Sequence, residues 1–285
     1  MKGYILSDQD ELFGATRAVG FGDGIFSVRE IHRDHANAII SRNHYSRKFV
    51  NNSYVHLGVF IDGELLGVLQ FGYAINPASG ESVVAGTANN EYLELNRMWL
   101  DDFAPKFSES RAISYSVKYI RRAHPQVKWI QSFADERCGL NGKVYQAANF
   151  SFYGEHTSVF WEIDGEYFHN IVATSPSRGG RIARQRFMAG RDRAVRHELR
   201  QFRYLFFMAP RFARGCNLQR KPYPAVGPED EPETIGCEQG ATPCDRSNFP
   251  APKAAIENRD ARDLQVACVR LRDATTAIWQ AESGL

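Results

Sequence analysis

The chain has 285 residues, enough to bury a substantial core, and one domain with appended segments is expected at this length. The formal charge of +2 is nearly balanced, so the whole-chain charge does not itself point to a polyanionic partner. No apolar run is long enough to span a bilayer, and acidic residues soon after Lys2 argue against a signal peptide. Five cysteines, an odd number without a CxxC pair, favour a reducing cytoplasm.

The first part of the chain predicts a helix followed by a β-hairpin. Residues 1–27 carry weak signals and are expected to form an N-terminal extension. Residues 28–41 have a partial apolar stripe at helical spacing, which favours a helix. Residues 54–61 and 65–71 read as two strands, and the Asp62-Gly63 pair between them is a strong hairpin-turn signal.

The next stretch predicts a strand, a loop and a helix. Residues 91–100 (EYLELNRMWL) alternate as a strand does. One predicted face carries Leu93, Leu95, Arg97 and Trp99. Ser108 and Ser110 are suitable N-caps for the helix that follows, and His124-Pro125 stops that helix.

A second strand at residues 127–133 then leads to the acidic pair Asp135-Glu136. A strand, a loop, a helix N-terminus and a parallel strand form a layout that binds phosphates. Acyltransferases of the GNAT fold hold their donor in the same layout.

The remaining segments complete one α/β domain and a tail. We expect further elements at residues 143–148 (helix), 158–163 and 166–171 (hairpin), 180–200 (basic helix) and 202–208 (strand). The prediction is a mixed twisted sheet flanked by helices over residues 28–215. A linker rich in Pro, Gly and acids follows at 216–253, and residues 254–285 form either a last helix or a disordered extension.

Two polar groups are candidates for chemistry. His44 and Tyr45 lie in the polar segment SRNHYSRK, where imidazole is able to act as a base or a metal ligand. A plain polar loop is the alternative. Asp135 and Glu136 follow a predicted parallel strand, the end at which open α/β sheets bind ligands. Either carboxylate is able to accept a proton from an amine or to bind a metal, and helix capping is the alternative.

Arg97 and Tyr145 are two further candidates. An arginine in the row of Leu93 and Leu95 is costly unless it is paired or points into a site, and a salt bridge to Glu136 is the structural alternative. Tyr145 lies where acyltransferases often place a general acid, although a core tyrosine is the commoner outcome.

Lys106, Ser108, Ser110 and Arg111 surround the predicted helix N-terminus. They favour an anionic donor, either a pyrophosphate or the 3′ end of a nucleic acid. The loop lacks the spaced glycines of the usual acetyltransferase loop, which weakens the assignment to coenzyme A.

Residues 178–214 hold eleven arginines against two acids, with aromatic residues between them. Because arginine binds phosphate bidentately, this density predicts contact with a nucleic acid, and a solvated basic helix is the alternative. The expected DNA contacts are Arg178, Arg181, Arg184 and Arg186.

Four segments carry a resemblance to a known family: SRNHYSRKFVNNSYVHLGVFIDGELLGVLQFG, YLELNRMWL, SESRAISYSVKYIRR and VKWIQSFADERCGLNGKVYQAANFSFYGEH. They are similar to the Mom family of DNA-modification proteins from Mu-type bacteriophages, over roughly residues 28–215. The resemblance implies a GNAT-like fold and conversion of adenine in double-stranded DNA to N6-(carbamoylmethyl)adenine, which blocks host restriction. It implies functional positions at His44, Tyr45, Arg97, Ser110, Asp135, Glu136 and Tyr145.

The resemblance also associates the protein with an acyl-CoA donor and with iron, for which His44, Tyr45 and Asp135 would be the ligands. The added group has the composition of a glycine amide. Acetyl-CoA supplies two carbons but no nitrogen, whereas glycine on tRNA supplies both. Glycyl-tRNA and acetyl-CoA therefore stay open as donors.

The target adenine must leave the duplex, and the aromatic residues Tyr45, Phe49 and Tyr54 are suited to stack on it. Two other functions stay open. One is an N-acetyltransferase acting on a protein or small-molecule amine, and the other is a non-catalytic DNA-binding protein that shields restriction sites. The sequence also leaves open whether the protein forms a homodimer.

Overall fold

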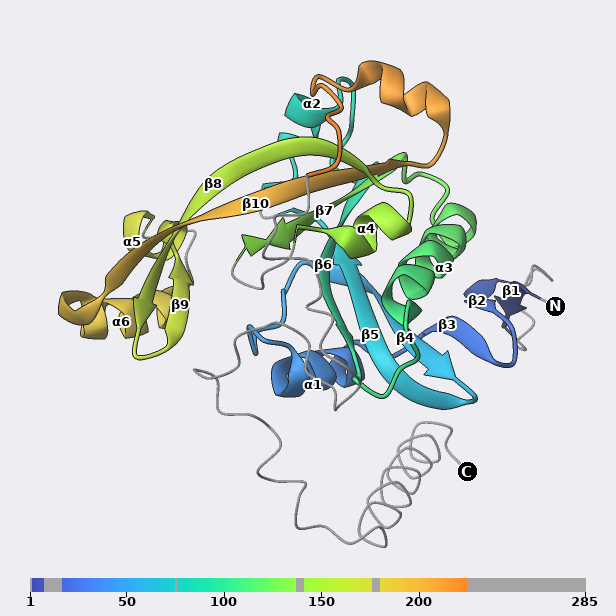
Figure 1. Cartoon of the computed structure of the whole chain (residues 1–285), viewed down its shortest axis with the longest axis horizontal. Helices are drawn as coiled ribbons and strands as arrows, with labels where there is room; N and C mark the ends of the chain where they lie inside the picture. Colours follow the sequence, from blue (N-terminus) through green and yellow to red (C-terminus); the bar gives the residue numbers. More distant parts are fainter. Residues whose placement is uncertain (1, 8–16, 75, 137–140, 176–179, 225–285) are drawn as a thin grey trace, which may run out of the picture. The chain divides into compact units, whose positions relative to one another are not determined.

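The computed structural model describes residues 2–7, 17–74, 76–136, 141–175 and 180–224, all within one compact unit. Their strands form one ten-stranded sheet in the order β1-β2-β3-β4-β5-β6-β7-β10-β8-β9 (Figure 1). Within these residues β6 and β7 are the parallel pair, and the other neighbours are antiparallel. The predicted α/β class, a mixed sheet flanked by helices, is confirmed. The predicted tail at 254–285 and the linker beyond residue 224 lie outside the described residues.

The strands are β1 (Gly3–Leu6), β2 (Ala18–Gly22), β3 (Phe26–Glu30), β4 (Ser53–Ile61), β5 (Glu64–Gly72), β6 (Tyr92–Leu100), β7 (Trp129–Asp135), β8 (Ser151–Ile163), β9 (Glu166–His169) and β10 (Val195–Phe207). The helices are α1 (Arg33–Asn43), α2 (Ser79–Val83), α3 (Ser108–Ala123), α4 (Lys143–Ala147), α5 (Asn170–Thr174) and α6 (Arg181–Gly190), and the short 3-10 helices are η2 (Arg191–Arg193) and η3 (Pro210–Gly215).

The hairpin of β4 and β5 forms as predicted. Asp62 and Gly63 both have positive φ, 49° and 86°, which is the backbone that an Asp-Gly turn supplies. The helix predicted at residues 28–41 is wrong at its start, because Val28 lies in β3 and is fully buried beside β4. The helix α1 begins later, where the His32 side chain caps it by accepting from the Asp34 amide.

The N-terminal residues are part of the sheet rather than an appended extension. The strands β1 and β2 pair with each other, and β2 pairs with β3. Phe21 and Phe26 lie in the main apolar core, and Tyr115 of α3 packs on both rings edge-on. The predicted domain start at residue 28 is therefore too late for this sheet.

The unit β6–α3–β7 has the predicted order and the predicted parallel pairing. Helix α3 covers one face of the sheet with a row of buried side chains that includes Ile113, Val117 and Ile120. The predicted caps Ser108 and Ser110 are wrong. The residue before the helix is Phe107, in the left-handed region with φ 70°, and Ser108 is the first helical residue.

A β-bulge reverses the alternation of β6. Phe71 of β5 pairs with Leu95, but its neighbour Gln70 pairs with Arg97, so the extra residue is Asn96. Leu95 faces the α3 core, whereas Trp99 packs with the apolar residues under α1. The prediction that Arg97 shares the face of Leu93 and Leu95 is therefore wrong.

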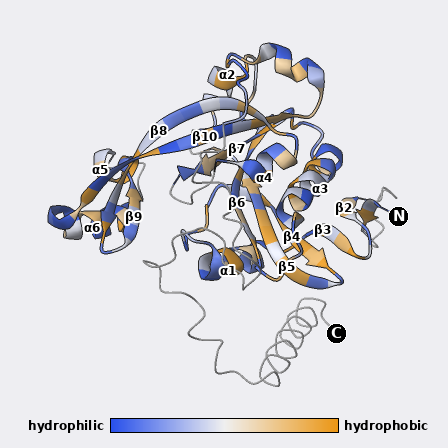
Figure 2. Ribbon diagram, viewed as in Figure 1, coloured by the Kyte–Doolittle hydropathy of each residue, from blue (hydrophilic) through white to orange (hydrophobic). Residues whose placement is uncertain are grey.

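The strands β8 and β10 continue past β7, and β9, α5 and α6 lie at their far end (Figure 1). We call residues 155–175 and 180–200 the arm. It has its own small apolar core, formed by Ile163, Phe168, Val172 and Phe187. The basic helix predicted at 180–200 ends at Gly190, and the residues from Val195 onward form a strand instead. In contrast to the arm, β4 and β5 are coloured largely as hydrophobic (Figure 2).

Candidate functional site

The carboxyl ends of β6 and β7 bring several predicted residues to one edge of the sheet. The parallel ladder ends at the pair Glu94 and Gln131, so the later residues of the two strands are not paired with each other. Arg97 follows on β6, and Asp135 is the last residue of β7. Helix α3 begins just after β6, so its N-terminus lies at this edge too.

The loop after α1 packs against this edge. The backbone carbonyl of Lys48 accepts a hydrogen bond from Arg97 Nε at 2.9 Å. His44 is buried, its Nδ1 lies 2.8 Å from Ser46 Oγ, and its ring centroid lies 4.2 Å from that of Tyr45. The hydrogen bond to Lys48 therefore links Arg97 to the loop that carries His44 and Tyr45, and the functional roles of these residues stay predictions.

The same loop also binds the arm. Lys48 Nζ lies 2.6 Å from a carboxylate oxygen of Glu166 and donates to the carbonyl of Tyr167 at 3.3 Å. It also lies 5.0 Å from the ring centroid of Phe168. Residues 44–48 thus connect β6 with β9, so the arm supports the loop that carries His44 and Tyr45.

The two predicted acids have different surroundings. Glu136 accepts hydrogen bonds from the backbone amide of Arg200 at 2.7 Å and from its Nε at 2.8 Å. These hydrogen bonds hold the pKa of the Glu136 carboxyl below its usual range. The alternative of a salt bridge between Arg97 and Glu136 is therefore wrong. Asp135 is the last residue of β7, where its backbone pairs with Gln201 of β10.

Tyr145 lies away from the face of Arg97. Its ring centroid is 5.4 Å from that of Tyr204 and 6.0 Å from that of Phe150, and it packs on the main core under α3. Tyr145 is only partly buried there, so its role as a general acid stays a prediction.

The sequence interpretation missed Glu94. Gln131 Nε2 donates to its Oε2 at 3.0 Å, and burial raises the pKa of the Glu94 carboxyl to about 7, although Arg97 and Arg203 oppose that shift. The available signal was an acid between two core leucines, Leu93 and Leu95, in a strand buried on both faces.

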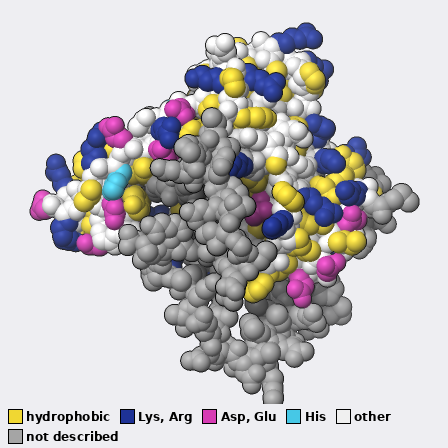
Figure 3. Space-filling view, in the orientation of Figure 1, with side chains coloured by type: hydrophobic (Ala, Val, Ile, Leu, Met, Phe, Trp, Pro, Cys, Tyr) yellow, Lys and Arg dark blue, Asp and Glu magenta, His cyan; other side chains and the backbone are white. Residues whose placement is uncertain are grey.

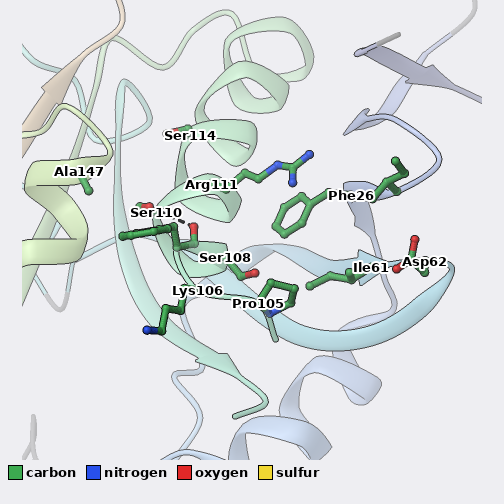
Figure 4. Close-up of a pocket in the computed structure, with 12 residues that line it drawn as sticks. Phe26, Ile61, Asp62, Pro105, Lys106, Ser108, Ser110, Arg111, Ser114 and Ala147 are labelled. Atoms are coloured by element: carbon green, nitrogen blue, oxygen red, sulfur yellow. Dashed lines mark hydrogen bonds between the residues drawn. The ribbon is translucent and has the colours of Figure 1, made fainter. Parts of the chain in front are cut away.

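A cavity of about 480 Å³ lies at the N-terminus of α3 (Figure 4). All four predicted donor-binding residues line it, namely Lys106, Ser108, Ser110 and Arg111. Sequence reasoning missed the opposite wall, formed by Ile25, Phe26, Ile61 and Asp62, because these residues were assigned to an extension and to a hairpin.

One of the two cationic side chains that line this cavity, Arg111, already contacts other residues of the protein. The Arg111 guanidinium lies 4.2 Å from the Phe26 ring centroid and 3.9 Å from Asp23 Oδ2, so its position is fixed. At the rim, the Phe107 side chain is 77% exposed. The cavity therefore offers one fixed cation, three serine residues and an exposed aromatic ring.

The positive charge of the arginine-rich segment at residues 178–214 is partly neutralised by acidic residues from neighbouring strands. Arg184 caps α5 by donating to the carbonyls of Val172 and Ala173, and Arg186 pairs with Glu166. Within the described part of the chain, Arg181 and Arg191 are exposed and make no ion pair. Figure 3 shows Lys and Arg side chains interleaved with Asp and Glu at this end of the molecule. Arg178 lies outside the described residues.

The described ranges contain no group of three or more His, Cys, Asp or Glu side chains that could hold a metal ion. Ser46 occupies Nδ1 of the proposed ligand His44, which leaves Nε2 as the nitrogen able to bind a metal. The iron site of His44, Tyr45 and Asp135 stays a prediction, and no step below uses a metal. Among the same described ranges, no helix is long and apolar enough to cross a membrane.

Fold and site define an α/β protein with a polar site at the carboxyl ends of one parallel strand pair. The Mom protein family matches residues 25–225. The methylcarbamoylase Mom of Escherichia phage Mu is 51% identical over 209 residues, which cover 72% of this chain and 86% of that protein. The chain therefore belongs to the Mom protein family.

Solved structures with partial similarity are acetyltransferases. The ribosomal-protein-S5-alanine acetyltransferase of Vibrio fischeri has a TM-score of 0.38 at 10% identity, covering 67% of this chain and 98% of that one. An acetyltransferase of Salmonella typhimurium that modifies the N-terminal serine of ribosomal protein L7/L12 has a TM-score of 0.38 at 12% identity, covering 66% and 97%.

Proposed function

We propose that this protein is a DNA-modification enzyme that converts adenine in double-stranded phage DNA to N6-(carbamoylmethyl)adenine. The observation that carries the proposal is the 51% identity to a methylcarbamoylase over 86% of that protein's length. A transferase that marks phage DNA in the cytoplasm of the host bacterium would protect it from host restriction enzymes.

The surface beside Arg97 suits an adenine that has left the duplex. Tyr45 and Phe49 are 48% and 46% exposed, so their rings are accessible to a base. Aromatic rings next to a polar site hold an extruded base by stacking. A carboxylate at this edge would then remove a proton from N6 as the amine attacks, and Asp135 is one candidate for that role.

The donor would bind at the N-terminus of α3. The cavity there joins Lys106 and Arg111 with the backbone amides of the first helical turn, an arrangement suited to phosphate groups. Two donors fit this chemistry, glycyl-tRNA and acetyl-CoA. Glycyl transfer to N6 gives an isomer of the carbamoylmethyl product, so a rearrangement without any added atom would complete the reaction, whereas acetyl transfer needs a separate nitrogen source.

Duplex DNA would contact the arm through the exposed guanidinium groups of Arg181 and Arg191. Because Lys48 connects the arm to the loop of Tyr45, DNA bound to the arm would lie near the base-stacking residues. Phosphate contacts of this kind position a protein on DNA without reading the sequence.

Restriction of purified plasmid DNA tests this function. Plasmid from bacteria that express the chain is freed of protein and digested with enzymes whose sites contain adenine. Covalent modification predicts resistance that survives deproteinisation. Full sensitivity after deproteinisation would contradict it and favour shielding by occupancy. An N-acetyltransferase of proteins or small molecules predicts full sensitivity as well, together with acetyl transfer in the absence of DNA.

A further inference from the structure

The carboxyl group of Glu94 lies at the point where β6 and β7 stop pairing, which we call the fork, and the proposed function does not yet use it. Glu94 and Gln131 are the last pair of the parallel ladder, and the Gln131 amide nitrogen donates to Glu94 Oε2 at 3.0 Å. Glu94 therefore lies where the two strands stop pairing, which is the place at which parallel sheets bind ligands.

Glu94 shares its face of the sheet with the proposed base-stacking loop. The core under α3 takes Leu93 and Leu95, so Glu94 between them points to the other face. The bulge at Asn96 then returns Arg97 to this same face, where its Nε binds the Lys48 carbonyl. Glu94 and Arg97 therefore share the face opposite α3, and Arg97 contacts the loop that carries Tyr45.

The other charged and titratable groups around Glu94 come from two strands and one segment. Arg97 lies on the same strand, and Arg203 approaches from β10 with its guanidinium 5.2 Å from the Phe133 ring centroid. Tyr92 is the preceding residue on this face of β6, and Cys216 lies beyond Arg203. In contrast to Glu136, which Arg200 clamps, Glu94 accepts its hydrogen bond from a neutral amide.

We infer that Glu94 is the catalytic base that removes the N6 proton, with Asp135 orienting the amine. This inference rests on the proposed function. In the step, N6 attacks the carbonyl carbon of an activated ester or thioester donor and the N6–C bond forms. The C–O or C–S bond breaks, its electron pair leaves with the leaving group, and the N6 proton passes to the Glu94 carboxylate. The carboxyl pKa of about 7 suits a base that works near neutral pH.

The test measures the rate of adenine modification in plasmid DNA by the purified full chain between pH 5.5 and 8.5. An extract of bacteria without this protein supplies the donor. The parent rate is expected to rise up to tenfold per pH unit below about pH 7 and then level off. Glu94→Gln, which keeps the shape, should lower the plateau rate by ~100-fold or more and remove the rise. Asp135→Asn should slow the reaction but keep the rise.

Two further variants make the test specific. Glu91→Gln is the matched control, because it makes the same change at a surface residue that pairs with Lys128, and it should retain the parent rate. Gln131→Met removes a hydrogen bond that lowers the Glu94 pKa, so it should move the rise to higher pH. DNA binding and the unfolding midpoint of each variant are measured in parallel, since a structural role would change these but not shift the pH profile.

The outcomes separate the inference from the function on which it rests. If Glu94→Gln keeps the parent pH profile, or a rate within threefold of the parent, Glu94 is not the base. If Asp135→Asn loses the rise while Glu94→Gln keeps it, the base is Asp135. If the parent chain leaves adenine unmodified, the proposed function fails, and the inference about Glu94 fails with it.

Discussion

Arg97 Nε donates a hydrogen bond to the backbone carbonyl of Lys48 at 2.9 Å, and this contact joins β6 to the loop that carries His44 and Tyr45. The bulge at Asn96 makes it possible, because without the extra residue the Arg97 side chain would point toward the α3 core. One guanidinium thus positions the proposed base-stacking loop beside the fork where Glu94 lies.

Arg97→Lys should therefore impair modification far more than folding. Lysine keeps the charge but lacks the planar fork that binds a carbonyl from Nε, so residues 44–48 would lose their fixed position. We expect modification to fall by ~10-fold or more, as misplacement of positioning residues commonly causes. Thermal unfolding with nucleoside analysis of plasmid DNA checks both effects, and unchanged modification would rule out a positioning role for Arg97.

The ion pair of Glu136 and Arg200 should contribute mainly to stability. The folded-state pKa of Glu136 is lowered, so its stabilisation is present above its ordinary value of 4.5 and is lost as the pH falls through the folded value. Because the pair is partly exposed, Glu136→Gln should cost no more than ~1 kcal/mol at pH 7 and less at pH 3.5. Denaturant titration at the two pH values measures this. An equal cost at both would show that the charge of Glu136 is not what stabilises the fold.

Arg181 and Arg191 should supply DNA affinity that is insensitive to sequence. Replacing both by alanine removes two phosphate contacts, so the dependence of log K on log[salt] should become shallower by about 2. Arg193→Ala is the matched control, since that guanidinium is engaged by Asp164 at 2.7 Å. Binding to a labelled duplex at several salt concentrations gives both slopes. Equal slopes for the double variant and the parent would remove the arm from the proposed DNA contact.

The donor is tested by removing RNA. If glycyl-tRNA is the donor, treating the extract with ribonuclease should abolish modification, and adding tRNA charged with glycine after the ribonuclease is inhibited should restore it. Acetyl-CoA added to the treated extract is the control. Modification that continues after rigorous removal of tRNA would contradict the glycyl route and favour acyl-CoA.

The sequence predicted the local elements well where one strong signal decides them. The Asp62-Gly63 turn and the parallel pair around α3 follow from local chemistry. The sequence-based predictions failed where residues far along the chain determine the local structure. The bulge in β6 depends on register with Gln70 and Phe71 of β5, so alternation alone placed Arg97 on the face opposite Glu94, which is wrong.

The arginine block shows the same limit for charge. Counting acids only within residues 178–214 overestimated the net positive charge of the arm. Asp164 and Glu166 lie outside that window, but they fold against Arg193 and Arg186. Conversely, Phe26 lines the cavity at the N-terminus of α3, although it precedes residue 28, where the predicted domain begins. Pairing of β3 with β4 brings it into the sheet. Neither effect is visible in a local sequence pattern.

The central claim is covalent modification of adenine in DNA, and mass spectrometry of nucleosides tests it most directly. Plasmid DNA is purified from bacteria that express the chain or its Asp135→Ala variant and is digested to nucleosides. The account predicts a deoxyadenosine species heavier by one carbamoylmethyl group in the parent sample and its absence with the variant. Unmodified deoxyadenosine from well-expressed, folded parent protein would contradict the account.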